Sequence, residues 1–209
     1  FQKLDLVDGD CTAPNTEYWY KVVNRKPGEF SMEPDKKDDV VYTDEYLNYL
    51  INTLGNSTSG GFNAYALDNE PGLWNGTHKL AHSEHVTCDE LIEKSIDLAQ
   101  VVKDMDGSAE VFGPSLYGYT AYQSLAGAPD WGRKQSAGNY RWFIDYYLDE
   151  MKKAEKSDGR RLLDVLDIHY YTEAKGECGQ RFCSHYDRDG CVKARLDSVR
   201  SLFEEGFLE

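Results

Sequence analysis

Gly61-Phe62-Asn63-Ala64-Tyr65-Ala66-Leu67-Asp68-Asn69-Glu70-Pro71-Gly72-Leu73-Trp74 predicts a strand that ends in a polar turn. The short apolar and aromatic run over 62–67 is typical of a buried β-strand. Pro71 ends that strand because proline has no backbone N–H for the ladder. Glu70 then falls at the carboxyl end, where parallel α/β barrels carry their chemistry. The pattern indicates a sugar-cleaving acid beside an exposed Trp74. The alternative is a structural glutamate that caps the next segment.

The rest of the chain predicts helices and strands in alternation. Hydrophobic spacing predicts a helix that Thr43 caps and Gly55 ends, and helical spacing returns after a Thr87 cap. Two more apolar runs predict further strands. The expected helices are 43–54, 88–104, 139–157 and one near 193–204, and the expected strands are 62–67, 109–113 and 163–169.

Strands that recur between helices indicate right-handed parallel βαβ units. We therefore predict an α/β fold, a (β/α)8 TIM barrel of which this chain covers roughly helix 3 to helix 6. An open doubly wound sheet is the alternative. The chain offers no Gly-rich phosphate loop or GxGxxG turn that would favour that alternative.

The whole chain, residues 1–209, is expected to be one partial catalytic domain. Residues 1–42 are polar and hold three prolines, which predicts a long loop, and 43–209 hold the βα units. The start at Phe1 is neither a Met nor a signal peptide. We expect the chain to be part of something longer.

Composition narrows the classes of partner. The formal net charge of −14 argues against nucleic acid and against anionic membranes, both of which attract lysine and arginine. No run of apolar residues is long enough to span a bilayer. Aromatic residues make up 13% of the chain, which suits a protein that packs sugar rings on flat side chains. A neutral glycan is the partner most compatible with these features.

Five cysteines favour an oxidising compartment, and hence a secreted protein. Three of them, Cys178, Cys183 and Cys191, share a polar loop with His185. A disulfide-stapled loop is the favoured interpretation, and zinc is the alternative, although zinc knuckles use closer cysteine pairs.

Other metal sites receive little support. His78, His82 and His85 do not have the spacing of a helical zinc motif. Asp187-Arg188-Asp189-Gly190 is only a fragment of a calcium loop, so structural calcium stays open. We predict no metal at the site and no required cofactor.

Four blocks of the chain resemble glycoside hydrolase family 44 and occur in the order expected for it. They are Leu67-Asp68-Asn69-Glu70-Pro71-Gly72-Leu73-Trp74, Val111-Phe112-Gly113-Pro114-Ser115-Leu116-Tyr117-Gly118, Asn139-Tyr140-Arg141-Trp142-Phe143-Ile144-Asp145-Tyr146-Tyr147-Leu148 and Leu162-Leu163-Asp164-Val165-Leu166-Asp167-Ile168-His169-Tyr170-Tyr171. The resemblance implies a (β/α)8 barrel with an accessory β-sandwich.

The resemblance also implies an activity: retaining endo-hydrolysis of β-1,4-glucans, including xyloglucan, and extending to mannan or xylan. Glu70 takes the place of the general acid/base at the end of barrel strand 4. The nucleophile of such an enzyme is a glutamate at the end of strand 7, which by our strand count we expect beyond Glu209.

Several further residues are expected to contact substrate. Asn69 would bond the sugar 2-hydroxyl, and Trp74 would stack on a sugar ring. His169 and Tyr171, two positions apart, would share one face of a strand and touch the sugar or the nucleophile. Tyr117 is a weaker candidate. Three of them have a structural alternative: Asn69 would close a turn, Trp74 would be a packed loop aromatic, and His169 would be a core histidine.

Two other interpretations compete with a family 44 glucanase. The chain would be a non-catalytic glycan-binding module or an inactive barrel fragment if it kept the aromatic rim without a nucleophile. It would be a different sugar-cleaving barrel if Asn-Glu had arisen by convergence.

Overall fold

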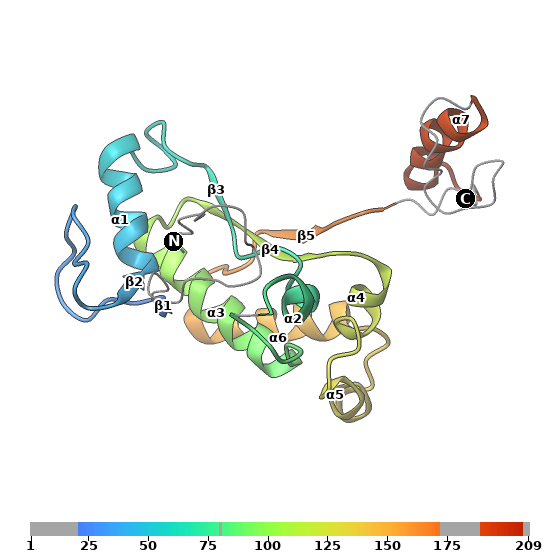
Figure 1. The fold of residues 1–209 in the computed structure, drawn as a ribbon, viewed down its shortest axis with the longest axis horizontal. Helices are drawn as coiled ribbons and strands as arrows, with labels where there is room; N and C mark the ends of the chain where they lie inside the picture. The colour runs from blue at the N-terminus through green and yellow to red at the C-terminus, as the bar shows by residue number, and fades with distance from the viewer. Residues whose placement is uncertain (1–20, 80, 172–188, 207–209) are drawn as a thin grey trace, which may run out of the picture. The chain divides into compact units, whose positions relative to one another are not determined.

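A computed structural model describes residues 21–79, 81–171 and 189–206. The chain divides into two compact units, Phe1–His169 and Tyr170–Glu209. The first unit contains two sheets with helices, and the second contains a short helical segment (Figure 1).

The larger sheet of the first unit has three parallel strands, which confirms the predicted βαβ units. They are β3 (Ala64–Ala66), β4 (Glu110–Leu116) and β5 (Val165–Ile168), in the spatial order β3-β4-β5. Tyr65 lies opposite Val111, and Phe112 lies opposite Val165. The carboxyl ends of all three strands therefore share one edge, as parallel pairing requires.

The central strand is the buried one. Val111 and Leu116 of β4 are fully buried. Gly113 allows close packing, because a Cβ there would lie 2.9 Å from Leu67 Cδ1. The segment 62–67 does contain a strand, but the prediction that this strand is buried is wrong, because Phe62 is 48% exposed and Ala66 is exposed. In the described residues β3 pairs with β4 alone.

The helices between the strands form where their patterns predict them. They are α1 (Thr43–Leu54), α3 (Cys88–Met105) and α6 (Phe143–Asp158). The Thr87 hydroxyl accepts from Glu90 N at 3.0 Å and caps α3, as expected. Thr43 is the first residue of α1 and not its cap, which is Tyr42.

The core lies between α3, α6 and β4. Leu91, Ala99 and Val102 of α3 are buried, as are Phe143, Tyr147 and Met151 of α6. Burying an aliphatic or aromatic side chain of this size contributes roughly 1.5–3 kcal/mol. This packing fixes the helices against the strand that carries the site.

Some loops hold more structure than the sequence predicts. The region after β3 forms η2 (Pro71–Leu73) and α2 (Trp74–Thr77), and the region after β4 forms α4 (Tyr119–Ser124) and α5 (Trp131–Gly138). These helices span one or two turns, too short to show a clear hydrophobic period.

The predicted loop 1–42 also contains two short strands in its described part. They are β1 (Lys21–Val23) and β2 (Val40–Tyr42), which pair in parallel with each other. The segment is tied to α3: Asn24 Nδ2 donates to Asp97 Oδ2 at 2.7 Å, and Arg25 Nη1 donates to Asp104 Oδ2 at 2.9 Å.

The second unit contains α7 (Asp189–Ser198) and η3 (Val199–Leu202), close to the helix predicted near 193–204. The hydroxyls of Tyr170 and Ser201 are hydrogen-bonded at 2.5 Å. None of the helices in the described residues is both long and apolar enough to cross a membrane.

Candidate active site

Glu70 lies just beyond the carboxyl end of β3, where the chain turns into η2. Its backbone is left-handed, with φ 49° and ψ 53°, an uncommon conformation for a residue with a side chain. Glu70 N donates to Ser115 O at 3.0 Å, and Glu70 O accepts from Leu73 N at 2.9 Å. Strained backbone held by its surroundings is common at functional sites.

The Glu70 carboxyl contacts His169, which follows β5, the strand on the other side of β4. His169 Nδ1 lies 2.7 Å from Glu70 Oε1, although the two residues are 99 positions apart. The side chains are 28% and 20% exposed for His169 and Glu70. The pair is shielded from bulk water yet open enough for a substrate to reach.

The central strand β4 holds both residues by their backbones. Ser115 O accepts from Glu70 N, and the next carbonyl, Leu116 O, accepts from His169 N at 2.7 Å. The Tyr122 hydroxyl also donates to His169 O. The backbone positions of the two residues, from which the carboxyl and the imidazole extend, are therefore fixed by hydrogen bonds to β4.

Ser115 adds a side-chain bond across the same edge. Its hydroxyl donates to Asp167 Oδ2 at 2.6 Å, and its backbone is left-handed with φ 53°. The β4–β5 register shifts between Pro114 and Leu116 at this point. The sequence did not single out Ser115, because no side-chain pattern signals a register shift.

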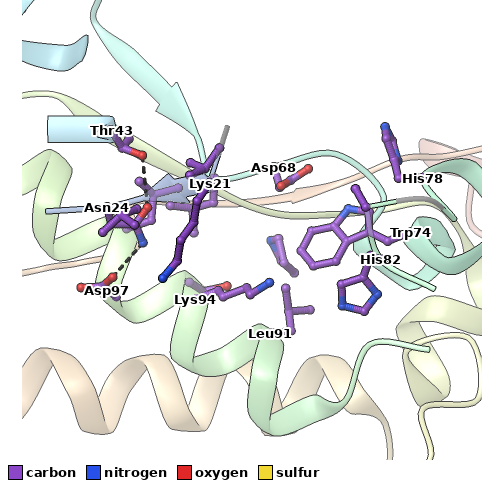
Figure 2. A pocket seen from close by; sticks show the side chains of 17 residues that line it. Lys21, Asn24, Thr43, Asp68, Trp74, His78, His82, Leu91, Lys94 and Asp97 are labelled. Carbon is purple, nitrogen blue, oxygen red and sulfur yellow. Dashed lines mark hydrogen bonds between the residues drawn. The ribbon is translucent and has the colours of Figure 1, made fainter. Parts of the chain in front are cut away.

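Trp74 does not have the exposed position that the sequence predicts. It is 9% exposed, so the expectation of an open ring is wrong. Its indole packs against the His82 ring, with centroids 5.4 Å apart, and Lys94 Nζ lies 5.2 Å from the ring centroid (Figure 2). His82 and Lys94 therefore contact the ring, and its stacking on a sugar stays a prediction.

Trp74 lines a cavity of about 790 Å³ together with residues of α3 and of the segment around β1 (Figure 2). Asp68 and Pro114, near the strand ends, also line it, whereas Glu70 does not. Among its lining residues, Thr43 donates to Asn24 and Asn24 donates to Asp97. The cavity is thus distinct from the Glu70–His169 pair.

The other predicted contact residues differ in their surroundings. Asn69 is exposed beside Glu70, and its N–H donates to Asp68 Oδ1 at 2.6 Å. Tyr117 is half-buried, packs on the core and bonds Thr120 through its hydroxyl. Tyr171 is 58% exposed and belongs to the second unit. Their roles toward substrate stay predictions.

The expected shared strand face of His169 and Tyr171 is not found. The strand β5 ends at Ile168, so both residues lie beyond it and the two-residue alternation does not apply to them. The backbone bond from His169 N to Leu116 O nevertheless extends the pairing by one residue. His169 contacts the acid Glu70, a contact that the sequence analysis did not predict, and its expected contact with the sugar or the nucleophile stays a prediction.

The three histidines after β3 have separate partners. His78 Nδ1 lies 2.9 Å from Thr77 Oγ1, and His82 Nε2 lies 2.9 Å from Glu90 Oε1. His85 contacts the carbonyl oxygens of Val86 and Ala126. The described residues contain no group of three or more His, Cys, Asp or Glu side chains placed to hold a metal ion.

The cysteine predictions concern residues outside the described ones, except at Cys88 and at the helical backbone of Cys191. Cys88 is buried and free. Burial raises the pKa of its thiol, and the nearby carboxylate of Asp130 raises it further. A thiol of this kind is inert, so Cys88 is a core residue.

The arrangement supplies one carboxyl group suited to proton transfer. A carboxyl that an imidazole contacts on one oxygen can give a proton to a substrate oxygen and later take one from water. Reaction of a sugar by this route also needs a second carboxyl across the glycosidic bond.

Comparisons with known proteins agree with the resemblance found in the sequence. The profile of glycoside hydrolase family 44 matches residues 8–174. Endoglucanase A of Paenibacillus lautus is 50% identical over 207 residues, which cover 97% of this chain and 29% of that protein.

Solved structures of the same family share the fold. The family 44 endoglucanase produced by Clostridium acetobutylium superposes with a TM-score of 0.87 at 47% identity, covering 93% of this chain and 38% of that one. A Paenibacillus polymyxa xyloglucanase of the family gives 0.86 at 44% identity, covering 92% and 37%.

This chain therefore spans well under half the length of the relatives that it matches. The prediction of an α/β fold that forms part of a (β/α)8 barrel is confirmed by this similarity.

Proposed function

The chain belongs to glycoside hydrolase family 44, and from this premise we propose that the protein containing it is a retaining endo-glycosidase that cleaves β-1,4-linked glucans. Cellulose-type chains and xyloglucan are the proposed substrates, with mannan and xylan as further ones. Relatives named endoglucanase and xyloglucanase support this substrate class.

Glu70 is the proposed general acid/base. The observation that carries this role is the position of its carboxyl: at the carboxyl edge of a parallel sheet, partly shielded and in contact with His169 Nδ1. In the first step the Glu70 carboxyl protonates the glycosidic oxygen as the bond to C1 breaks. In the second step its carboxylate removes a proton from the water that attacks C1.

The second carboxyl in this proposal comes from a later barrel strand of the complete polypeptide. Retention requires the two carboxyl groups to lie roughly 5–5.5 Å apart, so that the second can attack C1 directly. Because the substrate is a polymer, we further propose that the protein acts outside the cell. No cofactor is needed for this chemistry, and structural calcium stays open.

Substitution of the acid in the complete polypeptide tests the proposal. Glu70→Gln keeps the size of the side chain but removes the transferable proton, so release of reducing ends from xyloglucan and carboxymethyl cellulose should fall by about 10²–10⁴-fold. Glu110→Gln is the control, since Glu110 is an exposed carboxylate at the amino end of β4.

Azide distinguishes an acid/base from other essential groups. In Glu70→Ala, azide should attack the glycosyl-enzyme formed from an activated aryl β-cellobioside and yield a β-glycosyl azide. Full glucan hydrolysis by Glu70→Gln would refute the role of Glu70. Binding of glucan without cleavage by the unsubstituted protein would support a non-catalytic glycan-binding module instead.

A further inference from the structure

We propose that His169 is a positioning residue for Glu70: its imidazole holds the Glu70 carboxyl in the orientation that proton transfer requires. This inference rests on the proposed role of Glu70 as acid/base and extends it to a second residue. The contact that suggests it is the 2.7 Å approach of His169 Nδ1 to Glu70 Oε1.

The backbone anchors make this contact a fixed feature of the site. Glu70 and His169 each donate their N–H to β4, at the consecutive carbonyls of Ser115 and Leu116. The His169 carbonyl is held in turn by the Tyr122 hydroxyl. Since the backbones of both residues are anchored on either side of one strand, no further backbone entropy is lost when their side chains meet.

Partial burial strengthens the contact. The two side chains are only 28% and 20% exposed, so water competes weakly for their polar atoms. A hydrogen bond that involves a carboxylate or an imidazolium is roughly twice as strong as a neutral one. The imidazole therefore restricts the side-chain rotation of Glu70 more than solvent would.

The imidazole suits both halves of a retaining reaction. When Glu70 is ionised, a protonated Nδ1 donates to the carboxylate; when Glu70 carries its proton, Nδ1 can accept from the carboxyl or donate to its carbonyl oxygen. Lysine or arginine at this place would favour the ionised carboxylate alone. A histidine keeps the same carboxyl in place before and after it gives up its proton.

The test uses the complete polypeptide and two substrates that differ in leaving group. Xyloglucan has a sugar leaving group that needs protonation, whereas 2,4-dinitrophenyl β-cellobioside has one that departs without it. His169→Ala should lower kcat on xyloglucan by about 10²-fold, because a misplaced catalytic group costs that much. The rate of dinitrophenolate release in the first turnover should change by less than about threefold, because it needs no acid.

Two further variants separate positioning from folding. His169→Asn retains a polar group where Nδ1 lies and should recover most of the xyloglucan activity, whereas His169→Gln, with its amide farther out, should not. His78→Ala is the control, since His78 is an exposed histidine that bonds its neighbour Thr77. A merely structural loss would reduce the rates on both substrates together.

The outcomes are distinct. Equal losses on the two substrates, or unchanged kcat on xyloglucan in His169→Ala, would overturn the positioning role while Glu70→Gln still tests the acid separately. If Glu70→Gln hydrolyses xyloglucan at the normal rate, the acid/base role falls and the positioning role falls with it.

Discussion

The hydroxyl of Ser115 donates to the carboxylate of Asp167 at 2.6 Å and joins the ends of β4 and β5. This bond lies between the two anchors of the site, since Ser115 O accepts from Glu70 N and Leu116 O accepts from His169 N. Ser115 is 2% exposed, so water hardly competes with Asp167 for its hydroxyl. The bond stabilises the strand ends that hold the acid and the imidazole.

Ser115→Ala should lower the free energy of unfolding by about 1–3 kcal/mol, because it leaves a partly buried carboxylate without this donor. Ser115→Gly loses the same bond but relieves the left-handed backbone, so it should be about 1 kcal/mol more stable than the alanine variant. Urea denaturation of the complete polypeptide measures both, and Ser136→Ala on exposed α5 is the control. Equal stability of Ser115→Ala and the unsubstituted protein would contradict the prediction.

Trp74→Ala should mainly lower the free energy of unfolding. The buried indole packs against His82 and below Lys94, so truncation should cost about 3–5 kcal/mol of unfolding free energy. A sugar-stacking Trp74 would behave differently: the glucan dissociation constant would rise and the thermal midpoint would hardly move. Tyr119→Ala, at an aromatic residue that is 58% exposed, is the matched control. Calorimetric unfolding and glucan binding should be measured on the same samples.

Lys103→Met should be strongly destabilising. Lys103 Nζ is buried and donates to Asp164 Oδ2 and to Ala109 O, both at 2.7 Å. Removing one partner of such a pair costs about 3–5 kcal/mol, because the other charge stays buried. Asp164→Asn in the same chain should restore part of the loss, since the new side chain can still accept from Val111 N.

The comparison for Lys103 is Lys153→Met. Lys153 is an exposed lysine of α6 that bonds Asp149 and Glu150. Surface pairs of this kind contribute little, so its urea midpoint should stay close to that of the unsubstituted protein. Similar urea midpoints for the two lysine variants would show that the buried Lys103–Asp164 pair contributes no more to stability than a surface pair.

Asp130 gives a pH-dependent prediction. Its carboxylate accepts from Cys88 N at 2.8 Å and from Asp89 N at 3.2 Å, at the start of α3. Burial alone would raise the pKa of Asp130, but these backbone donors outweigh it and hold the pKa below its ordinary value. The carboxylate therefore stabilises the folded state above the unfolded pKa of about 3.9 and ceases to do so as pH falls through the lower folded value.

Asp130→Asn should accordingly lose about 1 kcal/mol of stability at neutral pH, by analogy with a helix cap. The difference from the unsubstituted protein should shrink as the pH is lowered below about 4. Urea midpoints at several pH values provide the measurement. A difference that stays constant down to low pH would show that the charge of Asp130 does not matter.

Regular elements could be predicted from the sequence because their signals are local. Apolar spacing placed α3 and α6 within a few residues, and Thr87 marked the start of α3. The short helices α4 and α5 escaped prediction, since one or two turns carry no period. The exposure of β3 escaped as well, because burial depends on what covers the strand and not on its own residues.

The site was predictable in part. Glu70 was predicted from Asn69-Glu70-Pro71, which ends a strand. His169 was predicted from its place at the end of the expected strand 163–169. The contact between them joins residues 99 positions apart, and no local pattern contains such information. The burial of Trp74 depends on Lys94 and His82, which reach it from other segments.

The consecutive carbonyls of β4 have a consequence for engineering new specificities. Since Glu70 N and His169 N donate to consecutive carbonyls of the same strand, grafting the residues that follow Glu70 or those that follow His169 from a relative would keep the acid and the imidazole aligned, provided that Pro114–Leu116 is left untouched. An insertion within β4 would instead displace one partner relative to the other. Library design should therefore vary the flanking turns and preserve the middle strand.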